Sequence, residues 1–499
     1  MSLLQNMAKK VLDRDPAIEL LEFERHWVTI GQMQRLAERV NALIDASGAD
    51  KRAPIAIVPR NRPAMLTTIL GLIGRERHVR MIHPYQSAAG LARDVERLKP
   101  AVTVAMAQDF ADELVATLRE QGVAGIALDG MEAAAVTGCE RSTAECDPPP
   151  PGPQIDLLTS GTTGPPKQFP LHYDFISQEM VIRSPLAIGA DIDPLTLAPA
   201  HLFWPFGNFS GLYSTLTPTL HGMRGVLADR FSAAECRDYM LRFRPVQLGI
   251  PPAGVQMLLD ADIPAEEFDS IKAVNVGSAP LALATQAAFE ERYHIPILQA
   301  YGATEFGGPV AMMTADLYAE WGAKKRGSVG RPSHGAQWRV IDPETGEVLP
   351  AGTEGLLEVV APRMGTHWIR TSDIGIVDED GFLWHRGRAD GAIMRGGFKL
   401  LPETIEHALV RHDAIAAAMV TGVSERRLGQ VPAVAIVLAP GADAPEIDDL
   451  KTFLRQHIES THIPVEWKFV EALPYNGMMK PDRIALRKLF EGEAAVAGA

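Results

Sequence analysis

The segment QIDLLTSGTTGPPKQF (residues 154–169) joins a short apolar run to a loop of glycines and hydroxyl side chains, followed by two prolines and Lys167. The apolar run predicts a buried strand. The loop leaves the carboxyl end of that strand, where open α/β sheets bind their ligands. Glycines let backbone N–H groups converge on an anion, hydroxyls add donors, and a lysine adds positive charge. The segment therefore predicts a phosphate site at the edge of a sheet.

Two other interpretations of this loop are possible from its composition. A Walker A loop needs a lysine directly after glycine and then a hydroxyl residue that opens a helix. Here two prolines separate Gly164 from Lys167 and a glutamine follows the lysine, so that template does not fit. The other alternative is a flexible polar surface loop. An unbroken run of such residues directly behind an apolar strand favours the phosphate site.

Strand and helix patterns alternate before this segment. APIAIVP (53–59) and HVRMIHP (78–84) predict strands, and RPAMLTTILGLIGR (62–75) and SAAGLARDVERLKP (87–100) predict helices. Such alternation predicts a parallel sheet covered by helices. The proline-rich CDPPPPGPQ (146–154) suits neither a helix nor a central strand, so we expect a surface linker there.

The pattern changes in the second half of the chain. Strand and helix patterns resume after the loop, but from about residue 326 short strands and glycine-rich turns predict an antiparallel β unit. The last hundred or so residues mix helices and strands and predict a small α+β domain. With 499 residues the chain is too long for one ordinary core. The predicted fold class is α/β, with a large N-terminal domain of parallel sheets covered by helices plus an antiparallel β unit, and a small α+β C-terminal domain.

Composition and charge restrict the class of protein. The chain is 46% hydrophobic and 22% charged, which is typical of a soluble globular protein. A net charge of -14 argues against a general nucleic-acid or anionic-membrane binder. We see neither a signal-peptide apolar region nor the ~18 consecutive apolar residues of a membrane span, so we expect a cytoplasmic protein. The three cysteines lack metal-ligand spacing and are expected to be free thiols.

Three further segments sharpen the hypothesis: QAYGATEFGG (299–308), the stretch from Trp368 to Glu406 that contains DGFLWHRGRADG, and LPYNGMMKPDRIALRKL (473–489). Together with the loop, and in this order, they resemble the adenylate-forming superfamily of acyl-CoA synthetases, luciferase and peptide-synthetase adenylation domains. The resemblance extends over essentially the whole chain and includes GSVGRP (327–332). It implies ATP and Mg²⁺ as cofactors, with coenzyme A or a phosphopantetheinylated carrier protein as the thiol.

The resemblance implies a role for each matching residue of the nucleotide site. The loop would grip the β and γ phosphates of ATP through Thr159, Ser160, Gly161, Thr162, Thr163, Gly164 and Lys167. Thr304 would bond the α-phosphate, and Glu305 would hold Mg²⁺. Tyr301, followed by Gly302 and Ala303, would stack on adenine, and Gly277, Ser278 and Ala279 would lie along the nucleotide edge. Asp373 would accept hydrogen bonds from both ribose hydroxyls, beside Arg388.

The same resemblance divides the chain into an adenylation core, residues 1–389, and a mobile C-terminal lid domain, residues 390–499, with a hinge near Asp390. Lys480 of the lid resembles the lysine that bridges the incoming carboxylate and the α-phosphate. Met479 stands where the family usually has glycine, which makes this match looser. Gly396 and Gly397 would let the pantetheine arm of the thiol pass.

A departure from the family pattern bears on the acid. The family commonly has histidine in an LFHxxG segment, whereas LFWPFG (202–207) has Trp204 there. We expect an acyl pocket lined by Trp204, Phe206, Asn208 and Phe209, with ordinary core packing as the alternative for each. HLFWPFGNFSGLYS (201–214) contains no aspartate to bind a substrate amine. An uncharged acyl or aryl acid is therefore favoured over an amino acid.

The predicted function is that of an ATP-dependent carboxylic acid:thiol ligase. It would form an acyl- or aryl-adenylate from a small carboxylic acid and then a thioester on coenzyme A, with AMP and pyrophosphate as products. Two alternatives remain open. The acyl group could pass to the phosphopantetheine of an acyl carrier protein, or the protein could bind a nucleotide or acyl-adenylate without ligating. No nucleic-acid partner is expected.

Overall fold

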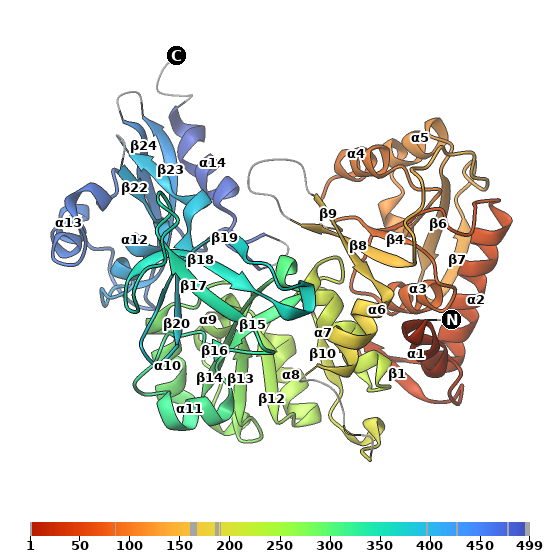
Figure 1. Ribbon diagram of the computed structural model, residues 1–499, viewed down its shortest axis with the longest axis horizontal. Coiled ribbons are helices and arrows are strands. Elements are labelled where there is room, and N and C mark those ends of the chain that lie inside the picture. The colour runs from red at the N-terminus through yellow and green to blue at the C-terminus, as the bar shows by residue number, and fades with distance from the viewer. Residues whose placement is uncertain are drawn as a thin grey trace. The chain divides into compact units, whose positions relative to one another are not determined.

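The computed structural model describes residues 2–84, 86–159, 167–184, 189, 191–395, 398–425, 428–476 and 479–494 (Figure 1). The chain divides into two compact units, Met1–Pro245 and Val246–Ala499. In the part of the chain that the structure describes, no helix is both long enough and apolar enough to cross a membrane.

The first unit contains a seven-stranded sheet in the order β7-β6-β5-β3-β4-β8-β9. Its strands are β3 (Ile55–Ile57), β4 (Val79–Met81), β5 (Val102–Met106), β6 (Ala124–Asp129), β7 (Glu132–Ala135), β8 (Gln154–Thr159) and β9 (Lys167–His172). Adjacent strands from β6 to β8 are parallel, and the two outer strands, β7 and β9, are antiparallel to their neighbours. The alternation of strands and helices therefore produces the parallel sheet that the sequence predicts.

Helices cover both faces of this sheet, as Figure 1 shows for α4 and α5 on one side and α2 and α3 on the other. The helices of the unit are α1 (Leu3–Leu12), α2 (Ile30–Ala46), α3 (Pro63–Ile73), α4 (Ala88–Leu98), α5 (Asp112–Glu120), α6 (Tyr173–Phe175), α7 (Phe209–Leu220) and α8 (Ala233–Phe243). Successive residues of a strand point to opposite faces. Ile55 and Ile57 accordingly join the core under α2 and α3, while Ala56 and Val58 join the core under α4 and α5.

The first unit holds a second, smaller sheet in the order β10-β11-β1-β2. Its strands are β1 (Glu19–Phe23), β2 (His26–Thr29), β10 (Ala200–Leu202) and β11 (Gly225–Leu227). A capping box between Thr29 and Gln32 begins α2 directly after β2. The residues 146–153 before β8 form neither helix nor strand, as the proline run predicts.

The second unit begins with the sheet β12-β13-β14-β15-β16, whose first three strands are parallel and whose last two are antiparallel to their neighbours. The strands are β12 (Gln247–Ile250), β13 (Ala273–Val276), β14 (Ile297–Ala303), β15 (Gly308–Met312) and β16 (Arg331–Pro332). The helices that follow them in the chain are α9 (Pro252–Asp260), α10 (Leu283–Tyr293) and α11 (Ala315–Trp321).

An antiparallel sheet follows, in the order β17-β18-β19-β20. Its strands are β17 (Gln337–Ile341), β18 (Glu354–Val360), β19 (Ile369–Val377) and β20 (Leu383–Arg388). Leu357 and Val359 of this sheet share a hydrophobic core with Tyr301 and Val310 of the preceding one. The two sheets therefore pack together within the second unit.

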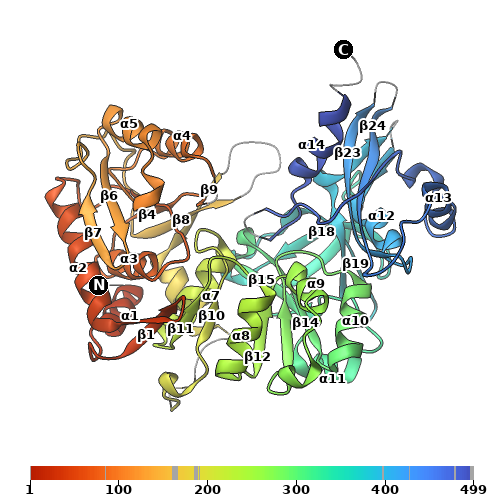
Figure 2. The same cartoon turned by 180° about the vertical axis from the view of Figure 1, so that it is seen from behind.

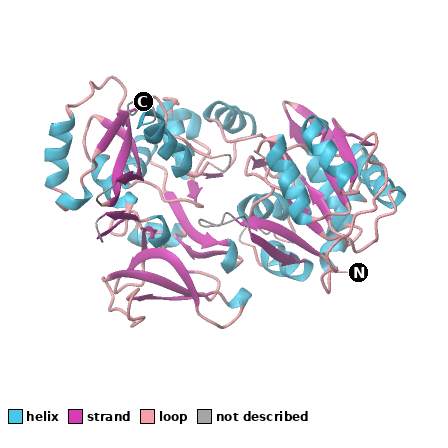
Figure 3. Cartoon of the chain, turned by 90° about the horizontal axis from the view of Figure 1, so that it is seen from above, coloured by secondary structure: helices cyan, strands magenta, loops and turns pink. Residues whose placement is uncertain are grey.

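The C-terminal part of the second unit mixes helices and strands, as Figures 2 and 3 show. Its sheet has the order β22-β21-β24-β23, and a further strand, β25, pairs with β24. The elements are β21 (Ile393–Arg395), β22 (Phe398–Leu400), α12 (Pro402–Leu409), β23 (Ile415–Glu425), β24 (Gly429–Leu438), α13 (Ile447–Arg455), β25 (Glu466–Phe469) and α14 (Arg483–Ala494). The predicted fold class, α/β with an antiparallel unit and a separate α+β end, is confirmed.

The chain changes from one sheet to the next at a short 3₁₀ turn, η7 (Ala389–Gly391), between β20 and β21. The compact units themselves divide after Pro245. The domain boundary between residues 389 and 390, with its mobile lid, stays a prediction.

Candidate active site

The predicted phosphate loop joins two antiparallel strands. β8 lies between β4 and β9, and its last residue, Thr159, pairs with Lys167 at the start of β9. A Walker A loop leads into a helix instead, so the geometry agrees with the rejection of that template. Ser160, Gly161, Thr162, Thr163 and Gly164 lie outside the described residues, as do the side chains of Thr159 and Lys167. Their phosphate contacts stay predictions.

A buried polar cluster holds the strand that carries this loop. Asp156 of β8 is 3% exposed. His78 Nε2 lies 2.6 Å from Asp156 Oδ2, and Gln154 Nε2 donates to Oδ1 at 2.5 Å. Arg80 of β4 adds its charge, with Nε 3.5 Å from Oδ2. A buried carboxylate needs such partners, so this cluster fastens β8 to β4 just before the loop departs.

In the second unit, two predicted nucleotide segments meet at one sheet edge. β13 and β14 are parallel neighbours with Val276 opposite Gln299, so Gly277–Ala279 leaves the end of β13 beside the last residues of β14, Tyr301 to Ala303. A Cβ on Gly277 would lie 3.4 Å from the carbonyl oxygen of Ala300. Ser278 adopts φ +71°, a left-handed conformation that costs about 1–2 kcal/mol for a residue with a side chain. Backbone strain of this kind is found more often at ligand sites than elsewhere.

Tyr301 connects this edge to the antiparallel sheet. Its hydroxyl donates to Oδ2 of Asp373 on β19, and its ring packs against Phe306 and His385. Burial, together with the charge of Asp373, raises the pKa of Tyr301, so the phenol stays protonated and donates. The predicted stacking on adenine remains a prediction, but the ring stands beside the carboxylate predicted to hold the ribose.

Asp373 is surrounded by donors. Arg388 of β20 lies opposite it in register, with Nη1 3.7 Å from Asp373 Oδ1, and His385 Nε2 lies 3.4 Å from the same oxygen. Burial opposes ionisation of Asp373, but the bonds from His385 and Tyr301 and the charge of Arg388 outweigh it and lower its pKa. The carboxylate is therefore ionised and can accept hydrogen bonds from hydroxyls.

Thr304 and Glu305 form a 3₁₀ turn, η5 (Thr304–Phe306), directly after β14. Gly307, at φ +66°, ends the turn in a conformation that glycine adopts readily. Glu305 is exposed. Mg²⁺ in phosphate-transfer sites takes one or two carboxylates and completes its shell with substrate phosphates and water. A single exposed carboxylate at this edge fits that requirement.

Lys480 lies within electrostatic reach of these residues. Burial and the charge of Arg388 lower its pKa, and the charges of Glu305 and Asp373 oppose that shift. A tight turn holds it, because Asn476 Oδ1 accepts from the Lys480 N–H at 3.1 Å and the Asn476 N–H donates to the Lys480 carbonyl at 2.9 Å. The second unit thus brings the C-terminal lysine to the predicted ribose and metal residues.

Comparison with known proteins identifies the family. A model of the AMP-binding enzyme family matches residues 7–365, and a model of its C-terminal domain matches residues 404–480. The chain belongs to the AMP-binding enzyme family. The predicted resemblance to adenylate-forming enzymes is confirmed.

Two relatives and one solved structure illustrate how similar this AMP-binding enzyme is to known members. A 2-succinylbenzoate–CoA ligase of Geobacillus sp. (strain WCH70) is 29% identical over 348 residues, or 67% of this chain and 68% of the relative. The fatty acid–[acyl-carrier-protein] ligase ScoC of Streptomyces coeruleorubidus is 30% identical over 371 residues, 70% of each chain. ATP-bound MatB from Rhodopseudomonas palustris superposes with a TM-score of 0.78 at 21% identity, covering 98% of this chain and 99% of that one.

The residues predicted to line the acyl pocket of this AMP-binding enzyme lie in the first unit. Phe206 is fully buried and Phe209 is 8% exposed, both in the main hydrophobic core. Asn208 caps α7 by accepting from the Gly211 N–H at 2.6 Å. Trp204 is half-buried, with its ring 5.3 Å from that of Phe203. Phe206, Phe209 and Asn208 therefore have packing or capping roles, and the acyl wall stays a prediction.

The predicted hinge and thiol residues of the enzyme are only partly described. Asp390 lies in η7, between β20 and β21. Gly396 and Gly397 lie outside the described residues, between β21 and β22, which pair with Arg395 opposite Phe398. Their roles in rotation and thiol access stay predictions.

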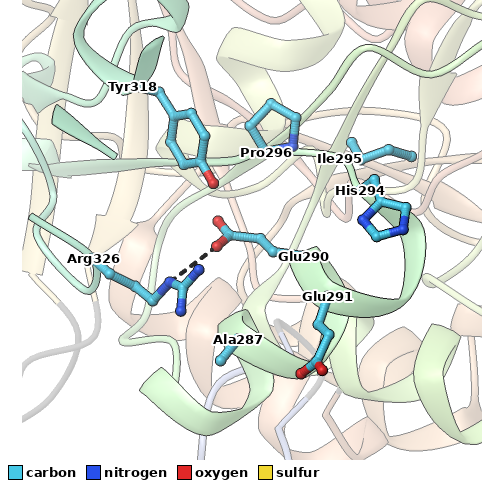
Figure 4. A pocket seen from close by; sticks show the side chains of 8 residues that line it. All are labelled: Ala287, Glu290, Glu291, His294, Ile295, Pro296, Tyr318 and Arg326. Carbon is cyan, nitrogen blue, oxygen red and sulfur yellow. Dashed lines mark ion pairs between the residues drawn. The ribbon is translucent and has the colours of Figure 1, made fainter. Parts of the chain in front are cut away.

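An open hollow of about 560 Å³ lies elsewhere in the second unit (Figure 4). Its lining residues are Ala287, Glu290, Glu291, His294, Ile295, Pro296, Tyr318 and Arg326. Glu290 faces Arg326 with 3.2 Å between Oε2 and Nε, and its Oε1 accepts from Gln286 at 2.9 Å. None of the predicted site residues lines this hollow. Oε1 of Glu290 also accepts from the Ile297 N–H at 3.2 Å, so this carboxylate links α10 to the start of β14.

Sequence reasoning missed His385, the second basic side chain near Asp373. Strand residues three apart normally point to opposite faces, so regular strand geometry would not give His385 and Arg388 a shared partner. A register shift in the β19–β20 pair, between Ile374 and Gly375, brings both to Asp373. The histidine stands in the quoted GFLWHRGR segment, but no local pattern signals the bulge.

Proposed function

We propose that the protein is an AMP-forming acid–thiol ligase that activates a small carboxylic acid with ATP and transfers its acyl group to coenzyme A. Family membership and the two curated relatives, a CoA ligase and a carrier-protein ligase, support this function. The observation that carries it is the electrostatic interaction of Lys480 with Glu305, Asp373 and Arg388. Phosphoryl chemistry needs positive charge placed where two anions meet.

The nucleotide would be held by groups already oriented for it. Asp373 is ionised and would accept the ribose hydroxyls, and Arg388 and Tyr301 fix its carboxylate. Glu305 would hold Mg²⁺, which when bound neutralises part of the triphosphate charge. Thr304 would donate to the α-phosphate. The Thr159–Lys167 loop would hold the β and γ phosphates.

In the first half-reaction, a carboxylate oxygen of the acid attacks the α-phosphorus of ATP and the bond to the bridging oxygen of pyrophosphate breaks. The acid and the phosphate are both anionic, so they repel each other on approach. The ammonium of Lys480 would lie between them and lower that barrier. Burial and the charge of Arg388 lower the pKa of Lys480, and the carboxylates of Glu305 and Asp373 oppose that shift.

In the second half-reaction, a thiol attacks the acyl carbonyl, AMP leaves and a thioester forms. Lys480 would have to withdraw to admit the thiol, which the proposed hinge at Asp390 would allow. Gly396 and Gly397 would then flank the pantetheine arm.

The acid and its acceptor are further parts of the proposal. The absence of an aspartate from residues 201–214 favours an uncharged acyl or aryl acid over an amino acid. The relative ScoC acts on a fatty acid and an acyl carrier protein, so a carrier protein is the second candidate acceptor. We place the reaction in the cytoplasm, where ATP and coenzyme A are found.

The test is exchange of labelled pyrophosphate into ATP across a panel of acids. At least one uncharged aliphatic or aromatic acid should support exchange. Addition of coenzyme A or of a phosphopantetheinylated carrier protein then identifies the acceptor by the thioester formed. If ATP binds but no acid supports exchange, the protein is a non-ligating nucleotide binder and the proposed activity is wrong.

Lys480→Ala separates the two half-reactions, which are measured by pyrophosphate exchange and by thioester formation. Exchange should fall by about 10²–10³-fold, a typical effect of removing one charged stabiliser of the transition state. Conversion of a preformed acyl-adenylate to thioester should stay near the wild-type rate, because Lys480 serves only the first step. Equal losses in both steps would contradict this assignment.

A further inference from the structure

Two buried side-chain atoms near the nucleotide site have no hydrogen-bond partner among the described residues. They are Nδ1 of His385, on β20, and Oε2 of Glu403, on α12. Buried polar atoms are rarely left unpaired in folded proteins. Two orphans on neighbouring elements therefore suggest a shared partner.

The two elements approach closely. Helix α12 packs on β20, and a Cβ added to Gly387 would lie 2.5 Å from Oε2 of Glu403. Gly387 follows His385 by two residues, and its lack of a side chain lets the Glu403 carboxylate approach β20 at this point. His385 contributes to the electrostatic environment of Glu403, which places the two groups within reach of each other.

The other polar atom of each side chain is already engaged. His385 Nε2 lies 3.4 Å from Oδ1 of Asp373, the predicted ribose carboxylate. Glu403 Oε1 accepts from Nη2 of Arg483 at 2.8 Å. When the Nε2 proton of His385 points at Asp373, Nδ1 of His385 can only accept a hydrogen bond. A bridge from Nδ1 to Oε2 of Glu403 therefore needs one proton. Burial raises the pKa of Glu403, which favours a carboxyl that can donate through Oε2.

We propose that His385 is a positioning residue that ties Asp373 to helix α12 through one water molecule held between its Nδ1 and Oε2 of Glu403. This rests on the proposed function, because Asp373 matters only if it holds the ribose. The bridge makes the orientation of the ribose carboxylate depend on the packing of α12 against β20. Nucleotide binding and the placement of the C-terminal part are then coupled.

The first test compares ATP with 2′-deoxy-ATP in the pyrophosphate exchange assay. His385→Phe keeps the ring volume but removes both nitrogens, so Asp373 loses its orientation. We expect the KM for ATP to rise about tenfold, the size of one lost hydrogen bond to a charged group, with a smaller rise for 2′-deoxy-ATP. His385→Gln, which can donate to Asp373 and accept from the bridging water, should restore most of the discrimination between the two nucleotides.

The second test measures the link to α12. A double-mutant cycle on the KM for ATP combines His385→Phe, Glu403→Leu and the double variant. The increase in KM of the double variant should be smaller than the two single increases predict when added as free energies. Glu406→Gln is the matched control. It lies on the same helix and removes a different Arg483 partner, so it should leave the ratio of KM values for ATP and 2′-deoxy-ATP unchanged.

Each outcome decides between the alternatives. An unchanged ATP to 2′-deoxy-ATP ratio in His385→Phe, or strict additivity in the cycle, would overturn the bridge and leave His385 as packing. Thermal unfolding checks that each variant folds. If His385→Phe does not fold, Glu403→Leu carries the test, because it breaks the same bridge and should also reduce the discrimination between ATP and 2′-deoxy-ATP. If the wild type exchanges pyrophosphate with no acid, the proposed function fails. The same nucleotide comparison by calorimetric binding then still decides the role of His385.

Discussion

Met479, directly before Lys480, adopts φ +57°, which places a side chain in the left-handed region. Glycine occupies this region without the steric cost that other residues incur. The Met479 N–H nevertheless donates to the Asn476 carbonyl at 2.9 Å, so the turn forms despite the cost. The family preference for glycine here therefore has a conformational reason, and methionine keeps the turn at a loss of stability.

Met479→Gly should relieve this strain. We expect the free energy of unfolding to rise by about 1 kcal/mol, measured by urea denaturation, with pyrophosphate exchange retained. Met479→Ala is the control, because it shortens the side chain but keeps the Cβ that causes the strain. An equal gain in both variants would show that the methionine side chain, and not the backbone, is the source.

His201 lies in an aromatic cluster of the first unit, stacked on Tyr239 at a centroid distance of 4.5 Å. Burial lowers the pKa of His201 to about 4. Between that value and the ordinary 6.5, the unfolded chain binds a proton that the folded protein does not. The free energy of unfolding should therefore fall as the pH falls through this window.

His201→Phe should remove this part of the pH dependence. Between pH 7 and pH 4.5 the wild type should lose about 2 kcal/mol more stability than the variant does. Urea denaturation of both proteins at the two pH values measures the difference. Parallel losses in the two proteins would mean that His201 is protonated in the folded state at pH 4.5.

At the scale of elements, the β14–β15 pair positions Tyr301 and Glu305. The two strands approach so closely at Gly302 that a Cβ there would lie 2.5 Å from the carbonyl oxygen of Gly308 and 2.7 Å from Cα of Pro309. Backbone atoms cannot move aside as a side-chain end can. Glycine is therefore required at this point for the hairpin to hold the site residues.

Gly302→Ala should force β14 and β15 apart. We expect a loss of about 2 kcal/mol in stability, as for other overpacked positions, and weaker ATP binding because Tyr301 and Thr304 shift. Gly249→Ala in β12 is a matched control, since a Cβ there has open space. Thermal unfolding and ATP titration measure both effects. Similar results for the two variants would show that the close approach does not constrain the site.

At the scale of the whole molecule, the proposed ligase must run two half-reactions in succession. Asp390 lies where the chain leaves one sheet and enters the next, so a few backbone angles there could reorient the C-terminal part. Proline fixes φ near −65° and limits such a rotation. Lys480 interacts electrostatically with Asp373 and Arg388, the residues predicted to hold the ribose, which is the arrangement that the proposed first half-reaction needs.

Asp390→Pro should therefore slow the second half-reaction more than the first. Thioester formation from preformed acyl-adenylate should fall at least about tenfold, equivalent to about 1.4 kcal/mol of barrier, while pyrophosphate exchange changes little. Asp390→Ala, which leaves φ free, controls for loss of the side chain. A proline variant with wild-type thioester formation would exclude residue 390 as the hinge.

Much of this protein follows from its sequence alone. Periodicity and proline placement are local, so the alternation of residues 53–100 already predicts β3, α3, β4 and α4, and the apolar run 154–158 predicts β8. Four motifs in order predict the family because each motif carries its own chemistry. The same motifs predict Tyr301, Glu305, Asp373, Arg388 and Lys480 as site residues.

The tertiary structure decided what local patterns do not encode. A register shift between β19 and β20 brings His385 to Asp373. Phe206 and Phe209, for which the sequence leaves an acyl wall and core packing open, are buried in the hydrophobic core. The packing of α12 on β20 brings Glu403 to the same strand. These placements depend on contacts between segments far apart in the chain, because side-chain direction follows the pairing register of whole strands and not the identity of neighbouring residues.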